Sequence, residues 1–138
     1  MKDLFHSIHP IPAIAPVSVA DNTALVSSVI DRQGYESASF IILSGSLADA
    51  DATFTALLEE SDNGSSFAAV ADSDLLGTEL LAGFTFVDDN ETRKLGYVGA
   101  KRYLRLTITP ANNASAALIA ALAVLGHPNL APTANPPV

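Results

Sequence analysis

The chain has 138 residues, which is enough for one domain with a hydrophobic core. Hydrophobic residues make up 49% of it and charged residues 16%, so most of the chain should fold. The net charge of −8 argues against nucleic-acid binding, and the lack of cysteine excludes disulfides, thiolate metal sites and cysteine nucleophiles. The longest apolar run, 114–125, is too short to cross a membrane, and residues 1–12 lack the apolar segment of a secretory signal.

Residues 1–20 are predicted to form an extended N-terminal arm. Three prolines lie between residues 8 and 17, and each fixes φ, lacks an amide donor and pushes the preceding residue toward an extended shape. A disordered terminus is the simplest interpretation. Ile8, Ile11 and Ile14 favour an arm that lies along a neighbouring subunit, because a tail in water has little use for isoleucines. Residues 128–138 are also rich in proline and are predicted to form an extended tail.

Residues 21–127 are predicted to form a β-sandwich domain, because short strand-like runs alternate there with turn residues. The runs are 23–30, 35–43, 52–60, 83–87, 92–98 and 102–109. Residues 88–91 are predicted to be the turn of a hairpin between two of these runs. The strongest alternation places six side chains in the core: Phe40, Ile42, Phe54, Leu104, Leu106 and Ile108.

The run 114–125 has two interpretations. Its alanines favour a helix, and alanine is a poor strand former. The run is nevertheless apolar on all sides, unlike a surface helix, and the strand before it needs a partner. A buried strand is therefore favoured; a weaker form of the same ambiguity applies to 48–60. The predicted fold class is all-β, an antiparallel β-sandwich or jelly roll with extended proline-rich arms.

No pattern of reactive residues predicts catalysis. His6, His9 and His127 would bind zinc only if the two termini met, and no cysteine accompanies His6 and His9 in the first arm. The acidic run 88–91 offers oxygen ligands for calcium but lacks the spacing of a calcium loop. Nucleophile-elbow and phosphate-binding motifs are absent from the sequence. We therefore expect no enzyme activity, no catalytic residues, no metal and no cofactor.

Five of the seven basic residues lie within thirteen positions of one another. They are Arg93, Lys94, Lys101, Arg102 and Arg105. One interpretation is a set of exposed salt bridges to the acids at 88–91, each of which would stabilise the fold only slightly. The alternative is a basic patch that docks on an acidic protein surface, including another copy of the chain. Together with the three isoleucines of the arm, these five residues are the predicted partner-binding set.

Several stretches resemble known families. Residues 99–128 resemble the closing strands of discoidin-like jelly rolls. A larger set of stretches resembles small uncharacterised proteins encoded in the structural-gene clusters of phages and prophages; it comprises 30–64, 74–79, 94–113 and 125–128. The phage resemblance spans about residues 21–128, and its motifs are strand and turn patterns rather than reactive residues.

The phage resemblance implies a structural protein of a virion, most closely a head decoration (cement) protein. Such a protein is expected on the exterior of the capsid, made in the host cytoplasm, bound to the major capsid protein lattice and assembled as a homotrimer, without nucleic acid or membrane as partners. Two alternatives stay open: a tail or baseplate accessory protein, and a carbohydrate-binding β-sandwich module. A small hydrolase is a more distant third.

Overall fold

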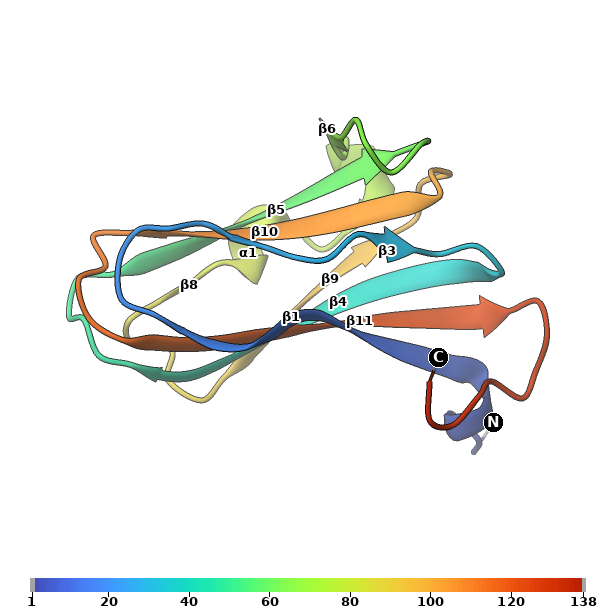
Figure 1. Cartoon of the computed structure of the whole chain (residues 1–138), viewed down its shortest axis with the longest axis horizontal. Coiled ribbons are helices and arrows are strands. Elements are labelled where there is room, and N and C mark those ends of the chain that lie inside the picture. The colour runs from blue at the N-terminus through green and yellow to red at the C-terminus, as the bar shows by residue number, and fades with distance from the viewer. Residues whose placement is uncertain (1, 138) are drawn as a thin grey trace.

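The computed structural model describes residues 2–137 and consists of two antiparallel sheets packed face to face (Figure 1). The strands are β1 (Ile8–Val19), β2 (Leu25–Val26), β3 (Ile30–Asp31), β4 (Tyr35–Leu47), β5 (Thr53–Ser61), β6 (Ala68–Ala69), β7 (Leu75–Leu76), β8 (Phe84–Thr85), β9 (Thr92–Tyr97), β10 (Tyr103–Ala111) and β11 (Ala117–Pro128). The helical segments are the 3-10 turns η1 (Phe5–Ser7) and η2 (Asp72–Asp74) and the single-turn helix α1 (Glu79–Ala82). No helix in this part of the chain is long and apolar enough to span a membrane.

Sheet A has the strand order β1-β11-β4-β9-β7, and sheet B has the order β2-β10-β5-β6, with β3 paired to β10 and β8 paired to β5. All the pairings are antiparallel. The fold class predicted from the sequence, an all-β antiparallel sandwich, is therefore confirmed.

The core lies between the two sheets and contains every core residue predicted above. Phe40 and Ile42 of β4 face Phe54 of β5 and the apolar residues of β10, and each of the six side chains is at most 1% exposed. Buried residues alternate with more exposed ones along β10 and from Thr53 to Leu58 of β5, which explains why these strands were readable from the sequence.

The run 114–125 is a strand for most of its length, as favoured from the sequence. β11 lies between β1 and β4 in sheet A, so its backbone is paired on both sides. Every second residue from Ala117 to Leu125 is buried against the other sheet. The small alanines on this inner side leave room for the larger side chains that come from sheet B.

The predicted N-terminal arm requires a correction. Residues 8–19 are extended as expected, but they pair along β11 as the edge strand of sheet A, and so the sandwich begins at Ile8 rather than at residue 21. Ile14 is buried in the core of its own chain. Ile11 packs against the same core, so these two isoleucines cover the sandwich itself, which explains their presence without a neighbouring subunit.

Pro10 and Pro12 of β1 have their backbone nitrogens on the side of the strand that faces away from β11. The carbonyl of Pro12 accepts a hydrogen bond from the Ser28 hydroxyl, and the carbonyl of Ile8 accepts one from the Thr133 hydroxyl, so both point away from β11. Pro10 lies between them with the same orientation, because backbone groups alternate along a strand. An edge with prolines at these positions has no amide to offer there.

The C-terminal residues also return to the sandwich. β11 extends to Pro128, one residue into the predicted tail. After it, the amide of Asn129 donates to the Gly34 carbonyl, and the amide of Thr133 donates to the His6 carbonyl. These bonds hold the segment against the start of β1, near which both ends of the chain lie in Figure 1.

The predicted hairpin between 83–87 and 92–98 is wrong. β8 pairs with β5 in sheet B, whereas β9 pairs with β4 and β7 in sheet A. Residues 86–91 therefore cross from one sheet to the other. The run 23–30 likewise gives only the short strands β2 and β3, because the amide of Ser28 between them turns to the Ala13 carbonyl of β1 and ties the two sheets together.

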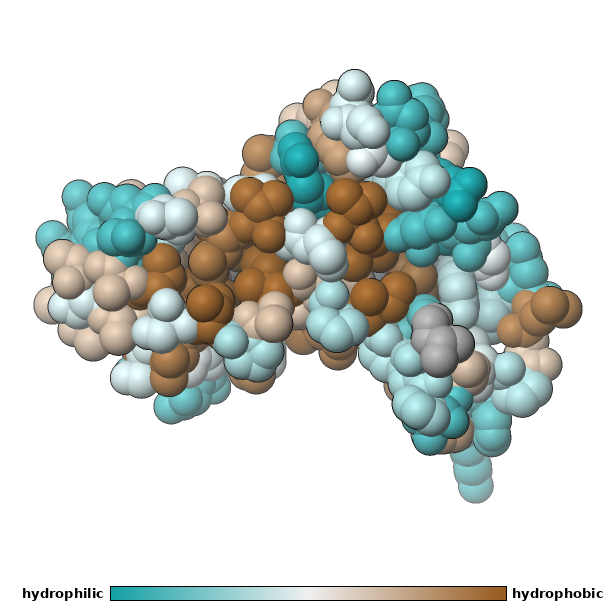
Figure 2. All heavy atoms as spheres, in the orientation of Figure 1, coloured by the Kyte–Doolittle hydropathy of each residue, from teal (hydrophilic) through white to brown (hydrophobic). Residues whose placement is uncertain are grey.

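The side of the sandwich on which β1 and the β2–β3 segment connect the two sheets faces the viewer in Figure 2. Hydrophobic side chains gather across its middle, over β1 and the β2–β3 segment, and hydrophilic ones gather toward the two ends. Exposed residues of this side include Val17, Val26 and Val29. On this side of the sandwich, an apolar surface therefore lies between the more hydrophilic ends.

Candidate interaction surfaces

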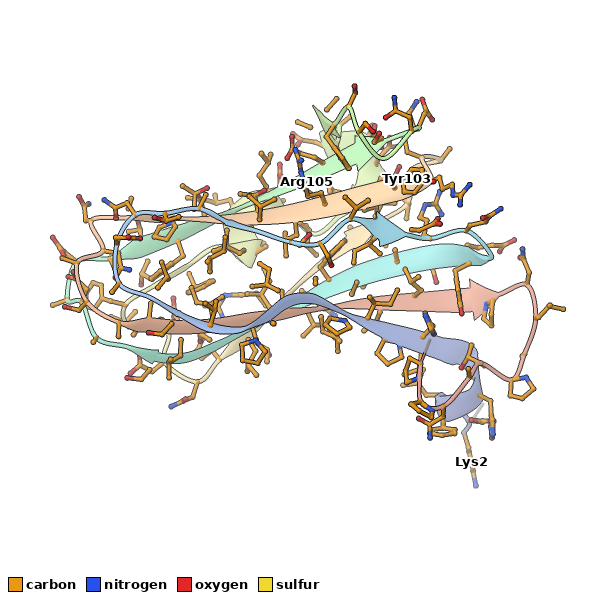
Figure 3. The ribbon with its side chains drawn as sticks, viewed as in Figure 1. Lys2, Tyr103 and Arg105 are labelled. Carbon is orange, nitrogen blue, oxygen red and sulfur yellow. The ribbon has the colours of Figure 1, made fainter. Side chains whose placement is uncertain are left out.

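The predicted basic cluster does not form one patch. Arg93 and Lys94 belong to β9 in sheet A, whereas Arg105 belongs to β10 in sheet B and Arg102 directly precedes that strand. Figure 3 shows Arg105 and Tyr103 on the β10 layer, whereas Lys2 lies on the opposite side of the sandwich, beyond β1. Residues close in sequence are separated here because β9 and β10 enter different sheets.

Four of the five predicted basic residues form ion pairs within the chain. Arg93 contacts Asp88 and Glu91, as the salt-bridge interpretation expected; the remaining pairs are Lys101–Asp62, Arg102–Asp31 and Arg105–Glu59. Hydrogen bonds from the Arg102 guanidinium lower the pKa of Asp31. Lys94 is exposed and has no ion pair among residues 2–137. The structure thus favours the salt-bridge interpretation over a docking patch.

Each of the three histidines contacts a different partner. His6 binds the Asp3 carboxylate, His9 stacks on Tyr35 with ring centroids 5.3 Å apart, and His127 hydrogen-bonds the Ser37 hydroxyl. Within residues 2–137, no group of three or more histidine or acidic side chains is arranged to hold a metal ion.

The two outer faces of the sandwich differ in chemistry. Residues of β4 and β11 that alternate with the buried ones point outward from sheet A, and most of them are aliphatic. We call this set the outer apolar face; it consists of Ile41, Leu43, Leu118, Ala120, Leu122 and Val124. The register places Ile41 beside Leu122 and Leu43 beside Ala120, so these side chains form one continuous surface.

The outer face of sheet B is mainly polar. Its central outward-facing residues are Thr53, Thr55, Leu57, Glu59, Arg105, Thr107 and Thr109. Here the register pairs threonine with threonine or leucine, and it pairs Arg105 with Glu59. Water can satisfy this face, whereas the aliphatic face of sheet A lacks comparable polar cover.

A groove is cut into one end of the outer apolar face. Its volume is about 450 Å³, and we call it the outer groove; its lining consists of Pro16, Val17, Ser18, Leu43, Ser44, Gly45, Asn90, Leu118, Ile119 and Ala120. Gly45 helps to form it, because a Cβ at that position would lie 2.9 Å from the Cβ of Leu118. None of the lining residues is charged, and none is aromatic.

A second apolar surface projects from α1. Leu80 is 88% exposed and Leu81 is 72% exposed, and we call this pair the leucine turn. The hydroxyl of Thr78 caps the helix by accepting from the Leu81 amide, and the Glu79 carboxylate accepts a 2.7 Å hydrogen bond from the Leu58 amide of β5. These contacts fix the turn on the sandwich while both leucines face water.

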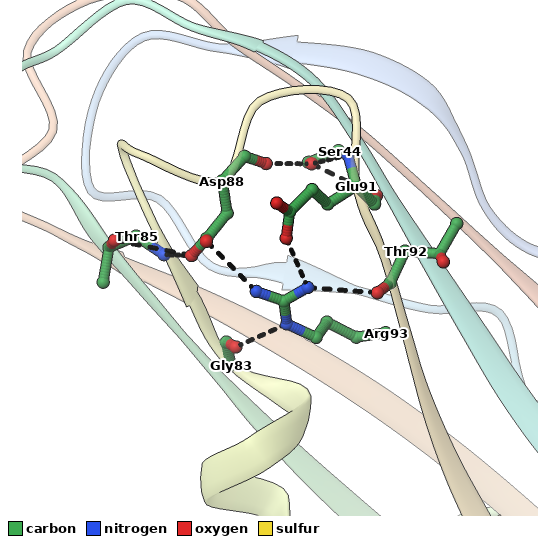
Figure 4. A network of polar contacts seen from close by, with 7 residues as sticks. All are labelled: Ser44, Gly83, Thr85, Asp88, Glu91, Thr92 and Arg93. Carbon is green, nitrogen blue, oxygen red and sulfur yellow. Dashed lines mark hydrogen bonds and ion pairs between the residues drawn. The ribbon is translucent and has the colours of Figure 1, made fainter.

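A polar network holds the segment that follows the leucine turn (Figure 4). The Nε of Arg93 donates to the Gly83 carbonyl, and an Nη of the same guanidinium lies 3.2 Å from Asp88. Asp88 accepts from the Thr85 amide through its carboxylate and from the Ser44 hydroxyl through its carbonyl. Because these bonds connect α1, the 86–91 crossing and β4, the leucine turn has a defined position.

Neither surface was predicted from the sequence. The adjacent leucines after Thr78 carried a detectable signal, since threonine is a preferred N-cap residue three positions before Leu81. The outer apolar face had no such signal, because in β11 both faces are aliphatic and periodicity does not distinguish inside from outside.

Comparisons with known proteins bear on the fold alone. No family model and no curated protein matches the chain. Among solved structures, PBSX exported protein XepA is similar with a TM-score of 0.54 and 16% identity over 85% of this chain. The VP2 subviral particle of infectious bursal disease virus gives 0.54 and 13% over 87%. The CBM22-1–GH10 modules of xylanase 10B from Clostridium thermocellum give 0.50 and 12% over 95%.

This chain spans only 36%, 32% and 28% of the lengths of those three chains, respectively. At such identities the likeness establishes a shared β-sandwich architecture and carries no residue roles.

Proposed function

We propose that this chain is a non-enzymatic structural protein of a phage virion: a head decoration protein that lies on the capsid exterior and binds across junctions of the major capsid protein. The observation that carries the proposal is the outer apolar face of sheet A. An aliphatic surface that covers two central strands, on a chain with a net charge of −8, is typical of a protein–protein contact.

The edge strands of the sandwich are poorly suited to pairing with a strand of another protein, so a partner is expected to dock on a sheet face. β1 lacks outward amides at Pro10 and Pro12, and the strands at the other edges, β2, β6 and β7, have two residues each. Strand addition needs a run of unpaired backbone groups, which these edges do not offer. A partner lattice would therefore meet side chains of the outer apolar face.

Two further observations support a virion role. The resemblance of residues 21–128 to phage structural proteins agrees with an all-β body built from two packed sheets. The same architecture also occurs in a viral particle protein, VP2, and in the PBSX protein XepA. A homotrimer above capsid junctions, as the phage resemblance implies, is part of the proposal.

The test is co-sedimentation of the purified chain with phage heads that lack it. Ile41→Lys places a charge on the outer apolar face and should reduce head binding at least tenfold. Leu57→Lys is the matched control, since Leu57 is 39% exposed on sheet B and Ile41 is 37% exposed on sheet A. The control should bind as the unmodified chain does.

Equal loss in both variants, or none in either, would exclude the outer apolar face as the docking surface. Binding to isolated tails but not to heads would replace the decoration role with that of a tail accessory protein. A chain that binds neither particle is not a virion component of either kind.

A further inference from the structure

We infer that the leucine turn of one copy of this chain inserts into the outer groove of a second copy, so that the protein self-associates head to tail. This contact goes beyond the proposed function, because it involves no capsid protein. It names a second surface, the leucine turn, and it assigns one end of the outer apolar face to another copy of the chain.

The leucine turn has the properties of an insertion element. A single exposed leucine needs no explanation, but Leu80 and Leu81 are adjacent and almost fully in water. The residues that follow the turn also fix it on the sandwich. Ala82 next to it is buried, and a Cβ at Gly83 would lie 2.9 Å from the Phe54 carbonyl, so the backbone of α1 rests directly on β5. Insertion would therefore order few additional groups, which lowers its entropic cost.

The outer groove matches this element in size and chemistry. A volume of about 450 Å³ lies within the usual range of about 300–1,000 Å³ for pockets that bind small molecules, and it has room for two leucine side chains. Val17, Leu43 and Leu118 provide aliphatic walls. Nothing in the lining is ionisable, so no charged group would be desolvated when the leucines enter.

The distribution of charged groups around the leucine turn and the outer groove also favours a second copy of the chain as the partner. Two chains of −8 repel each other, and they can meet most easily where neither surface carries uncompensated charge. The carboxylates beside the leucine turn are already engaged: Glu79 with the Leu58 amide, and Asp88 with Arg93. Across from them, the one exposed cation of β9 on the outside of sheet A is Lys94, beside Ile41. This cation offsets part of the repulsion between two acidic chains at the outer apolar face.

The position of the two surfaces determines the kind of assembly. α1 packs on β5 and β9 and lies between the two layers in Figure 1, whereas the outer groove is formed by β1, β4 and β11 on the outside of sheet A. A contact between different surfaces of identical chains is heterologous, and such contacts propagate until a ring closes. One insertion buries less than the roughly 1,600 Å² of a standard stable interface. When a ring closes, every chain inserts its leucine turn into one neighbour and binds the leucine turn of another in its own groove. Each chain then has a second contact.

Complementation between two defective variants tests this geometry. Leu80→Ser/Leu81→Ser removes the leucine turn, and Leu118→Lys charges the outer groove; each variant alone should be monomeric in sedimentation velocity experiments up to about 1 mM. Mixed in equal amounts at about 1 mM, they should form a weak one-to-one dimer, because one intact turn then meets one intact groove without the second contact that ring closure adds. Leu130→Ser, at a site 87% exposed, and Leu57→Lys are the matched controls and should assemble like the unmodified chain.

Unmodified chain that stays monomeric at about 1 mM overturns the inference, as does a mixture of the two variants that forms no dimer. Assembly of either variant alone, or loss of assembly in the controls, places the contact elsewhere. Since the contact is uncharged and the chains repel, added salt should strengthen the assembly; weakening by salt would contradict it. None of these measurements uses phage heads, so the outcome is separate from that of the decoration role.

Discussion

The hydroxyl of Tyr97 on β9 donates a 2.6 Å hydrogen bond to the Glu60 carboxylate on β5 and so connects the two sheets. The same oxygen accepts from the Lys101 amide, which fixes the loop between β9 and β10. Burial and the bond to Glu60 raise the pKa of Tyr97 to about 12. The Tyr97 hydroxyl thus connects the two sheets and also fixes the loop between β9 and β10. Its ionisation would break the hydrogen bond to Glu60.

The raised pKa predicts a loss of stability in alkali. Below pH 10 the tyrosine is protonated in both states, and between pH 10 and about 12 the unfolded chain loses this proton while the folded chain keeps it. The free energy of unfolding should therefore fall over that range. Tyr97→Phe should be less stable by about 1–3 kcal/mol at neutral pH, and this deficit should shrink as the pH rises. Urea unfolding of both chains measures it, and a deficit independent of pH would contradict it.

Phe54 should be among the most sensitive core positions. It is 1% exposed and stacks on Phe84 with ring centroids 4.8 Å apart. Phe54→Ala should lower the free energy of unfolding by about 3–5 kcal/mol, because the cavity cannot collapse between two sheets. Phe86→Ala, at a site 37% exposed, is the control and should cost far less. Equal losses in denaturant titrations would mean that Phe54 is not a core anchor.

Deleting residues 1–16 should damage the fold rather than release an arm. The deletion removes most of β1, exposes the backbone of β11 and takes Ala13 and Ile14 out of the core. Ile14→Ala alone should cost about 2–5 kcal/mol. Circular dichroism and binding of a hydrophobic dye report the change. A truncated chain that unfolds cooperatively at an unchanged temperature would show that the sandwich does not need its edge strand.

Arg93 should control the mobility of residues 83–91, the segment that follows the leucine turn. Arg93→Lys keeps the charge but cannot contact Gly83, Asp88 and Glu91 at once through a planar fork. We expect faster amide hydrogen exchange in residues 83–91 and little change in β10. Arg102→Lys, which alters an exposed pair with Asp31, should leave 83–91 unchanged. Protection of 83–91 that is unaffected by Arg93→Lys would mean that other contacts hold the segment.

The local alternation of apolar and polar residues predicted the strands. The features that it did not predict depend on contacts between residues far apart in the sequence. The alternation from Leu104 to Ile108 reports burial directly, so β10 and its core face were readable. The crossing at 86–91 was not, because an acidic turn has the same composition whether its flanking strands pair with each other or enter opposite sheets. For the same reason, the sequence did not show that the five neighbouring basic residues fail to form one patch. Pairing is decided by contacts distant in sequence, which periodicity does not contain.

The prolines of β1 could have been interpreted differently from the sequence alone. Pro10 and Pro12 are two residues apart, and in a strand this spacing places both on the same backbone side. Such spacing indicates an edge strand as well as it indicates a detached arm. The apolar residues between the prolines decide between the two, because an edge strand buries one face and a detached arm in water buries none.

The missing amides at Pro10 and Pro12 limit the ways in which crowded copies can aggregate. At high concentration, exposed strand edges of neighbouring copies can pair with each other and seed cross-β fibres. Fibre growth needs an unbroken ladder of backbone bonds from one chain to the next. With two consecutive outward positions unable to donate, a chain approaching β1 finds no template. Contacts between copies are left to side chains, which define discrete geometries and can end in a finite particle.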